Sequence, residues 1–127
     1  MRIALLLAAA VAARAQTSPD VLDLLRDLAQ TLTAQEPDDF LDHFDKKMPG
    51  YDVLRDNVRA LTARSELGSS IEIVTDDGDD RRRMLQLDWL LQIDRDPPRR
   101  QILKCTLERQ GKKWKVVALS PPDFFKP

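Results

Sequence analysis

The chain has 127 residues, of which 43% are hydrophobic and 32% charged, and its formal net charge is −1 at pH 7. Such a mixed, near-neutral charge balance creates no field strong enough to gather nucleic acid or anionic lipid, which argues against a nucleic-acid-binding protein. The length is typical of one domain with one hydrophobic core, and the single cysteine excludes an intrachain disulfide.

The first fifteen residues have the layout of a secretory signal peptide. Arg2 gives a positive start, residues 3–13 form an apolar run, and residues 13–15 supply the small residues of a cleavage site. The run is too short to span a bilayer as a helix. We therefore expect a leader over residues 1–15 and a single mature domain over residues 16–127. The expected location is secreted or periplasmic in a bacterium, with no stable membrane insertion of the mature chain.

Three helices are predicted in the first half of the mature chain. Ser18 can cap a helix over residues 19–34, in which apolar residues recur at spacings of three and four. A short second helix is expected over residues 37–46, before a stop at Pro49 and its neighbours. A third is expected from Tyr51 to about residue 62.

From Ser70 onward the apolar period changes to two, which is typical of strands. The clearest strand covers residues 85–93, where every odd position is apolar. Nine residues at roughly 3.3 Å each extend about 30 Å, so we expect the sheet to curl strongly. Later strands are predicted at residues 103–107 and 114–119, followed by a tail whose phenylalanines fold back onto the body. The expected class is α+β, with three helices packed on a strongly curved antiparallel sheet.

The residues expected to form the core are large and lie on the inward faces of these elements. They are Leu25, Leu28, Phe40, Phe44, Leu61, Leu87, Trp89, Leu91, Leu107, Trp114 and Val116.

This order of elements resembles the nuclear transport factor 2-like superfamily, which includes ketosteroid isomerases, scytalone dehydratase and small polyketide cyclases. The resemblance rests on the long first helix, the segment 40–45 (FLDHFD), the third helix, the long strand 85–93 and the segment 111–116 (GKKWKV). It covers nearly all of residues 19–125. It implies a cone-shaped, cystatin-like fold with a cavity that is an active site, a ligand pocket or a filled core.

The second predicted helix carries the only histidine of the chain. At about 100° per residue, Asp39 and His43 lie one helical turn apart at the border of the apolar face, where they can hydrogen bond. If both faced a cavity, His43 could act as general base or acid on a carbonyl substrate, with Asp39 orienting it and Tyr51 donating its hydroxyl. The same three residues also fit a purely structural role. His43 would then lie at the border of the apolar face, Asp39 would stabilise the positive end of the helix, and Tyr51 would be a capping aromatic.

Three other features have an expected role. Leu90, Val117 and Leu119 form a candidate homodimer patch on the outer face of the sheet. The acidic segment 76–80 and the arginines 81–83 face one another across a turn, where we expect them to be solvated and mutually compensating. Cys105 follows the alternation of its strand and is expected in the core.

No cofactor or metal motif is present in the sequence, so none is expected. Two hypotheses of function follow. The favoured one is an exported, non-enzymatic domain that binds a small apolar ligand or a protein. The alternative is a cofactor-free isomerase, dehydratase or cyclase that uses an acid/base pair in the cone cavity.

Overall fold

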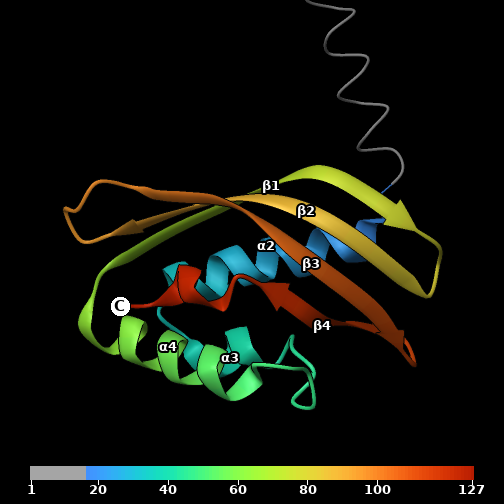
Figure 1. Ribbon diagram of the computed structural model, residues 1–127, viewed down its shortest axis with the longest axis horizontal. Helices are drawn as coiled ribbons and strands as arrows, with labels where there is room; N and C mark the ends of the chain where they lie inside the picture. Colours follow the sequence, from blue (N-terminus) through green and yellow to red (C-terminus); the bar gives the residue numbers. More distant parts are fainter. Residues whose placement is uncertain (1–16) are drawn as a thin grey trace, which may run out of the picture.

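The computed structural model describes residues 17–127, so the predicted leader lies outside the described residues. Three helices precede four strands and a final 3-10 helix. The helical elements are α2 (Pro19–Thr33), α3 (Pro37–Leu41), α4 (Tyr51–Arg64) and η1 (Pro122–Phe125). The strands are β1 (Leu67–Gly78), β2 (Arg82–Ile93), β3 (Arg99–Gln110) and β4 (Lys113–Ser120). They form one antiparallel sheet in the order β1-β2-β3-β4, and the helices lie on one of its faces (Figure 1).

Helix α2 begins as its sequence predicts. The Ser18 hydroxyl accepts a hydrogen bond from the backbone N–H of Val21 at 3.3 Å, and Pro19 occupies the first helical position. An apolar stripe is buried along the helix, which packs against β1; it is formed by Val21, Leu24, Leu25, Leu28 and Leu32. At the other end, Gln35 adopts a left-handed conformation with φ +58°. Its N–H bonds to the carbonyl of Leu32, while that of Glu36 bonds to the carbonyl of Thr31, the pattern of a Schellman motif.

Helix α3 is shorter than the predicted helix over residues 37–46. It ends at Leu41 because the chain then turns to pair with the edge of the sheet. The carbonyl of His43 accepts a hydrogen bond from the N–H of Val116, and the N–H of Asp45 donates to the Val116 carbonyl, both at 2.8 Å. Phe44, which lies between His43 and Asp45, thereby forms a parallel bridge with Val116. Satisfying β4's open edge therefore outweighs continuing the helix.

Strand β2 has the predicted faces, since all its odd-numbered side chains from Leu85 to Ile93 are buried. The prediction of a strongly curled sheet is wrong: the sheet twists without curling strongly (Figure 1). Curling was expected because a strand of this length was taken to fit a small domain only if the sheet curls. Instead, both ends of β2 reach solvent, where Arg82 and the turn after Ile93 are exposed.

One hydrophobic cluster joins the helices to the inner face of the sheet, and every residue predicted for the core is buried in it. The phenylalanines of η1 also belong to the cluster, so the C-terminal segment folds back as expected. Within residues 17–127, no helix has the length and apolarity needed to cross a membrane.

Candidate functional site

The three residues predicted as a catalytic group have different surroundings. Asp39 is exposed on α3, Tyr51 is buried in the core at the start of α4, and His43 is half-buried after the end of α3. No hydrogen bond or ion pair within residues 17–127 joins Asp39 to His43, and the charge of Asp39 is the weakest of the influences on the His43 pKa. The nearest carboxylate to the His43 ring is that of Asp27 on α2, with 4.0 Å between Nε2 and Oδ2.

Burial governs the protonation of His43. Desolvation lowers the pKa of the imidazole below its ordinary value of 6.5, although the charge of Asp27 acts in the opposite direction. The nearby ammonium of Lys115 lowers the pKa further. The ring is therefore neutral at pH 7, which suits a packed border histidine and does not by itself indicate catalysis.

We expect acidification to destabilise the fold through His43. Because the pKa is lower in the folded chain, the unfolded chain takes up the proton first as the pH falls below about 6.5. Stability is then lost until the pH reaches the folded pKa. The variant His43→Gln should show a smaller fall in melting temperature over this range, measured by circular dichroism. An equal fall in both proteins would mean that the His43 pKa is unchanged by folding.

Aromatic rings fill the interior between the helices and the inner face of the sheet. Phe40 of α3, Trp89 of β2 and Phe125 of η1 are all fully buried. The centroid of the Phe125 ring lies 5.1 Å from that of Trp89, edge to face, and 5.9 Å from that of Phe40. Phe44 and Phe124 extend the same cluster. The five rings, called the aromatic cluster below, form a packed core at this place.

The lone cysteine is part of that core, as predicted. Cys105 is buried on β3, and burial raises the pKa of its thiol to about 12. The thiolate form needed by a nucleophile or a metal ligand is therefore suppressed. Among residues 17–127, no group of three or more histidine, cysteine, aspartate or glutamate side chains is placed to hold a metal ion.

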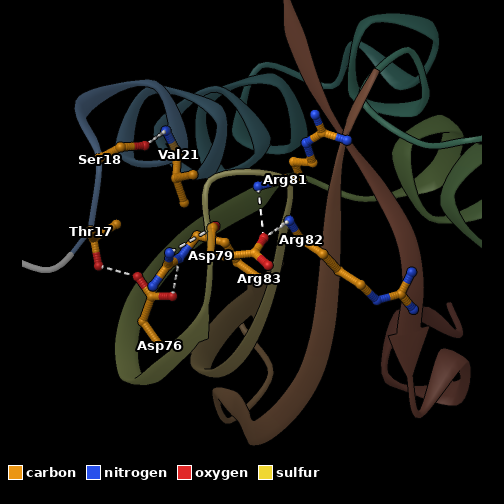
Figure 2. A network of polar contacts seen from close by, with 8 residues as sticks. All are labelled: Thr17, Ser18, Val21, Asp76, Asp79, Arg81, Arg82 and Arg83. Atoms are coloured by element: carbon orange, nitrogen blue, oxygen red, sulfur yellow. Dashed lines mark hydrogen bonds and ion pairs between the residues drawn. The ribbon is translucent and has the colours of Figure 1, made fainter. Parts of the chain in front are cut away.

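A polar network joins the beginning of the described chain to the β1–β2 hairpin (Figure 2). The Nε of Arg83 lies 2.6 Å from Oδ1 of Asp76, and the Thr17 hydroxyl donates to the other carboxylate oxygen at 2.5 Å. The Asp76 side chain is only 3% exposed and that of Arg83 13%. This pair was expected to be solvated, and that prediction is wrong.

A β-bulge explains the burial of Asp76. Ile73 pairs with Leu87 while Thr75 pairs with Gln86, which leaves Val74 as an extra residue on β1. Beyond the extra residue the alternation is reversed, so Asp76 turns to the inner face, opposite Leu85.

The turn after Asp76 is closed by a second carboxylate. Asp79 Oδ1 accepts hydrogen bonds from the backbone N–H groups of Arg81 and Arg82 at 2.8 and 2.9 Å. These bonds lower the pKa of Asp79. The Arg83 guanidinium also donates to the Asp79 carbonyl (Figure 2). The network as a whole has a structural role, since it fixes the hairpin and the N-terminal segment to each other.

The outer face of the sheet, turned away from the helices, carries large exposed apolar side chains. Met84 is 59% exposed and Ile102 47%, and Leu90 is also exposed. The predicted dimer patch is wrong at Leu119, which is only 7% exposed because it faces inward opposite Cys105. A second bulge explains this position. Val117 is an extra residue on β4, so the alternation reverses between the inward-facing Val116 and Leu119.

Two surface hollows lie outside the aromatic cluster, and the sequence indicated neither of them. One has a volume of about 280 Å³ between α2 and the start of β1. The other, called the polar hollow below, has a volume of about 640 Å³. The end of α4 and the turn between β2 and β3 form its walls. Asp39, His43 and Tyr51 line neither hollow.

No protein-family model matches the sequence, and no curated protein is similar enough to it to count as a relative. Solved structures do match the fold. A nuclear transport factor 2-like protein of unknown function from Shewanella oneidensis superposes with a TM-score of 0.70 and 11% identity, over 79% of this chain and 93% of that one. A putative scytalone dehydratase from Novosphingobium aromaticivorans gives 0.66 and 11%, over 79% and 78%.

The Bdellovibrio bacteriovorus protein Bd1075 is also similar, with a TM-score of 0.66 and 12% identity over 80% of this chain. This chain spans only 39% of that protein's length. At such identities the likeness concerns the fold. The chain has a nuclear transport factor 2-like, cystatin-like fold, as the order of its elements predicted.

Proposed function

We propose that this protein is an exported, non-enzymatic binding domain whose partner is a second copy of itself, held through the outer face of the sheet. The observation that carries the proposal is the distribution of apolar surface. The aromatic cluster fills the interior, while Met84 and Leu90 of β2 and Ile102 of β3 are exposed on the outer face, where Ile102 lies diagonally next to Leu90 and Met84 lies farther along the sheet. Exposed apolar side chains gathered on one face mark a protein interface more often than scattered ones do. Export rests on the leader-like residues 1–15.

Charge complementarity favours a second copy as the partner. On the outer face, Glu72 and Asp77 of β1 are exposed at one side, whereas Lys104 of β3 is exposed towards the other, as is Arg100, whose guanidinium is paired with Asp88 of β2. A two-fold axis parallel to the strands would place β1 of one copy over β4 of the other, and β2 over β3. The acidic half of each copy would then face the basic half of its partner, around the apolar side chains at the centre.

The binding function is better supported than the enzymatic alternative. An isomerase, dehydratase or cyclase would need His43 and a carboxylate in an open, mostly apolar pocket. A small apolar ligand inside the domain would have to displace rings such as Phe125 and Trp89, which are in contact with one another. The outer face requires no such displacement.

We expect the protein to sediment as a dimer at micromolar concentrations, and Ile102→Lys to sediment as a monomer, because the new ammonium would be buried at the centre of the interface. Val53→Lys is the matched control, since Val53 is equally exposed but lies on α4. It should remain a dimer. Analytical ultracentrifugation measures both.

A charge reversal checks the arrangement of the two copies. Glu72→Lys should weaken the dimer, because it places a cation in the half that faces the partner's basic half. A monomeric wild-type protein, or a dimer that survives Ile102→Lys, would contradict the proposal.

A further inference from the structure

The polar hollow is large enough for a ligand and is built from segments far apart in the sequence. Its volume of about 640 Å³ lies within the roughly 300–1,000 Å³ that is common for small-molecule sites. Gln35 after α2, Arg64 and Glu66 around the end of α4, and residues 94–96 after β2 line it. It is open to solvent, and its lining is more polar than apolar. A polar ligand would therefore suit it better than an apolar one.

Two residues with unusual backbone conformations hold the walls of this hollow. Gln35 and Asp94 are the non-glycine residues with positive φ in the described chain, at +58° and +50°. Glycine is the usual residue at the position that Gln35 occupies after α2. The Gln35 amide instead donates to the carbonyls of Thr62 and Ser65, at 2.8 and 2.5 Å, which ties α2 to the end of α4. Backbone strain of this kind is concentrated at functional sites.

Asp94 fixes the opposite wall. Its carboxylate accepts a hydrogen bond from the N–H of Glu66 at 2.8 Å, and its own N–H donates to the Glu66 carbonyl at 2.8 Å. The connection between α4 and β1 is thereby joined to the turn between β2 and β3. Both walls of the polar hollow are held in place before any ligand binds, which lowers the entropic cost of binding.

Charges of both signs face the polar hollow without partners. Arg64 and Arg95 make no ion pair with any residue in 17–127, although most of the other arginines there do. The carboxylates of Glu66 and Asp96 likewise take part in none of the ion pairs or side-chain hydrogen bonds found within those residues. The hollow therefore offers free guanidinium forks next to free carboxylates.

We propose that the polar hollow binds a short peptide through both of its charged ends. A guanidinium fork matches the geometry of a terminal carboxylate, and a carboxylate such as that of Asp96 would receive the terminal ammonium. A purely anionic ligand would be repelled by the acidic side chains, and a purely cationic one by the arginines. The proposal is independent of dimer formation, because the polar hollow lies at the end of the sheet and not on its outer face.

Three tripeptides test the proposal on the mature protein by isothermal titration calorimetry or NMR titration. Tri-alanine carries both terminal charges, N-acetyl-tri-alanine only the carboxylate, and tri-alanine amide only the ammonium. We expect tri-alanine to bind at least tenfold more tightly than either blocked form. Arg64→Gln and Arg95→Gln should each weaken tri-alanine binding several-fold. Lys112→Gln, in the turn between β3 and β4 at the other end of the sheet, should leave it unchanged.

Three outcomes would overturn the proposal. Equal binding of the blocked peptides would show that the end charges are not recognised. No measurable binding of tri-alanine at millimolar concentration would show that the polar hollow does not bind peptides of this kind. Unchanged binding in Arg64→Gln and Arg95→Gln would place the peptide elsewhere. Unchanged melting temperatures in these variants would exclude unfolding as the cause of any loss, and both arginines are exposed.

Discussion

Replacing Trp89 with alanine is expected to lower the free energy of unfolding by about 3–5 kcal/mol. The side chain is fully buried at the centre of the aromatic cluster, with Phe125 and Phe124 packed against it at ring-centroid distances of 5.1 and 6.2 Å. Its indole N–H also donates to the Ser69 hydroxyl at 2.8 Å. Because domains of this size are stable by only about 5–15 kcal/mol, the loss would be large. Denaturant titration followed by circular dichroism measures it.

Two controls separate the parts of the Trp89 effect. Trp89→Phe keeps an aromatic ring in the cluster and should cost clearly less than Trp89→Ala. Ser69→Ala removes only the acceptor of the indole hydrogen bond and should cost about 1–3 kcal/mol. A Trp89→Ala protein as stable as the wild type would mean that the inner and outer faces of β2 are assigned the wrong way round.

Asp76→Ala is expected to lower the free energy of unfolding by about 3 kcal/mol. The substitution leaves the Arg83 guanidinium, which is mostly buried, without its counter-charge and removes the acceptor of the Thr17 hydroxyl. Removing one partner of a buried ion pair is strongly destabilising because the other charge stays buried and unpaired. Denaturant unfolding of the purified variant measures the change.

The double variant Asp76→Leu with Arg83→Met distinguishes this cause from simple loss of packing. It removes both charges, so it should be more stable than Asp76→Ala alone. Asp23→Ala, which breaks the exposed pair between Asp23 and Arg26 on α2, should change the stability little. If Asp76→Ala had as small an effect as Asp23→Ala, the pair would not contribute as a buried one.

The parts of the fold that local sequence signals determine were predictable. Ser18 and Pro19 mark the start of α2, and the alternation from Leu85 to Ile93 identifies both faces of β2. Such signals depend only on neighbouring residues and on which side chains avoid water. The inward position of Cys105 follows from the same alternation.

Features that depend on distant partners were not predictable. The end of α3 is decided by pairing with Val116, which lies far along the chain. The burial of Asp76 depends on a bulge at Val74, and nothing in the local alternation marks that residue as extra. One inserted residue reverses every side chain after it, so Asp76 was expected to be solvated but lies on the inner face.

The candidate site was less predictable than the fold. The expected pairing of Asp39 with His43 assumed a helix that continues past Leu41. The polar hollow combines short loops after α2, α4 and β2, and its lining residues show no spacing that a motif search could recognise. The positive φ of Gln35 could not be predicted from the sequence, because glycine is the residue that usually marks such a conformation after a helix and α2 is followed by none.

The pairing of residues 43–45 with β4 also affects how the protein behaves when crowded. An edge strand with unpaired N–H and C=O groups can pair with the backbone of a neighbouring molecule and start fibre growth. Here both backbone groups of Val116 are already occupied, and on the opposite border the Thr33 hydroxyl accepts the N–H of Ser69. Each border of the sheet thus carries a built-in obstacle to strand-by-strand extension. Copies of the native protein should therefore meet face to face rather than polymerise side by side.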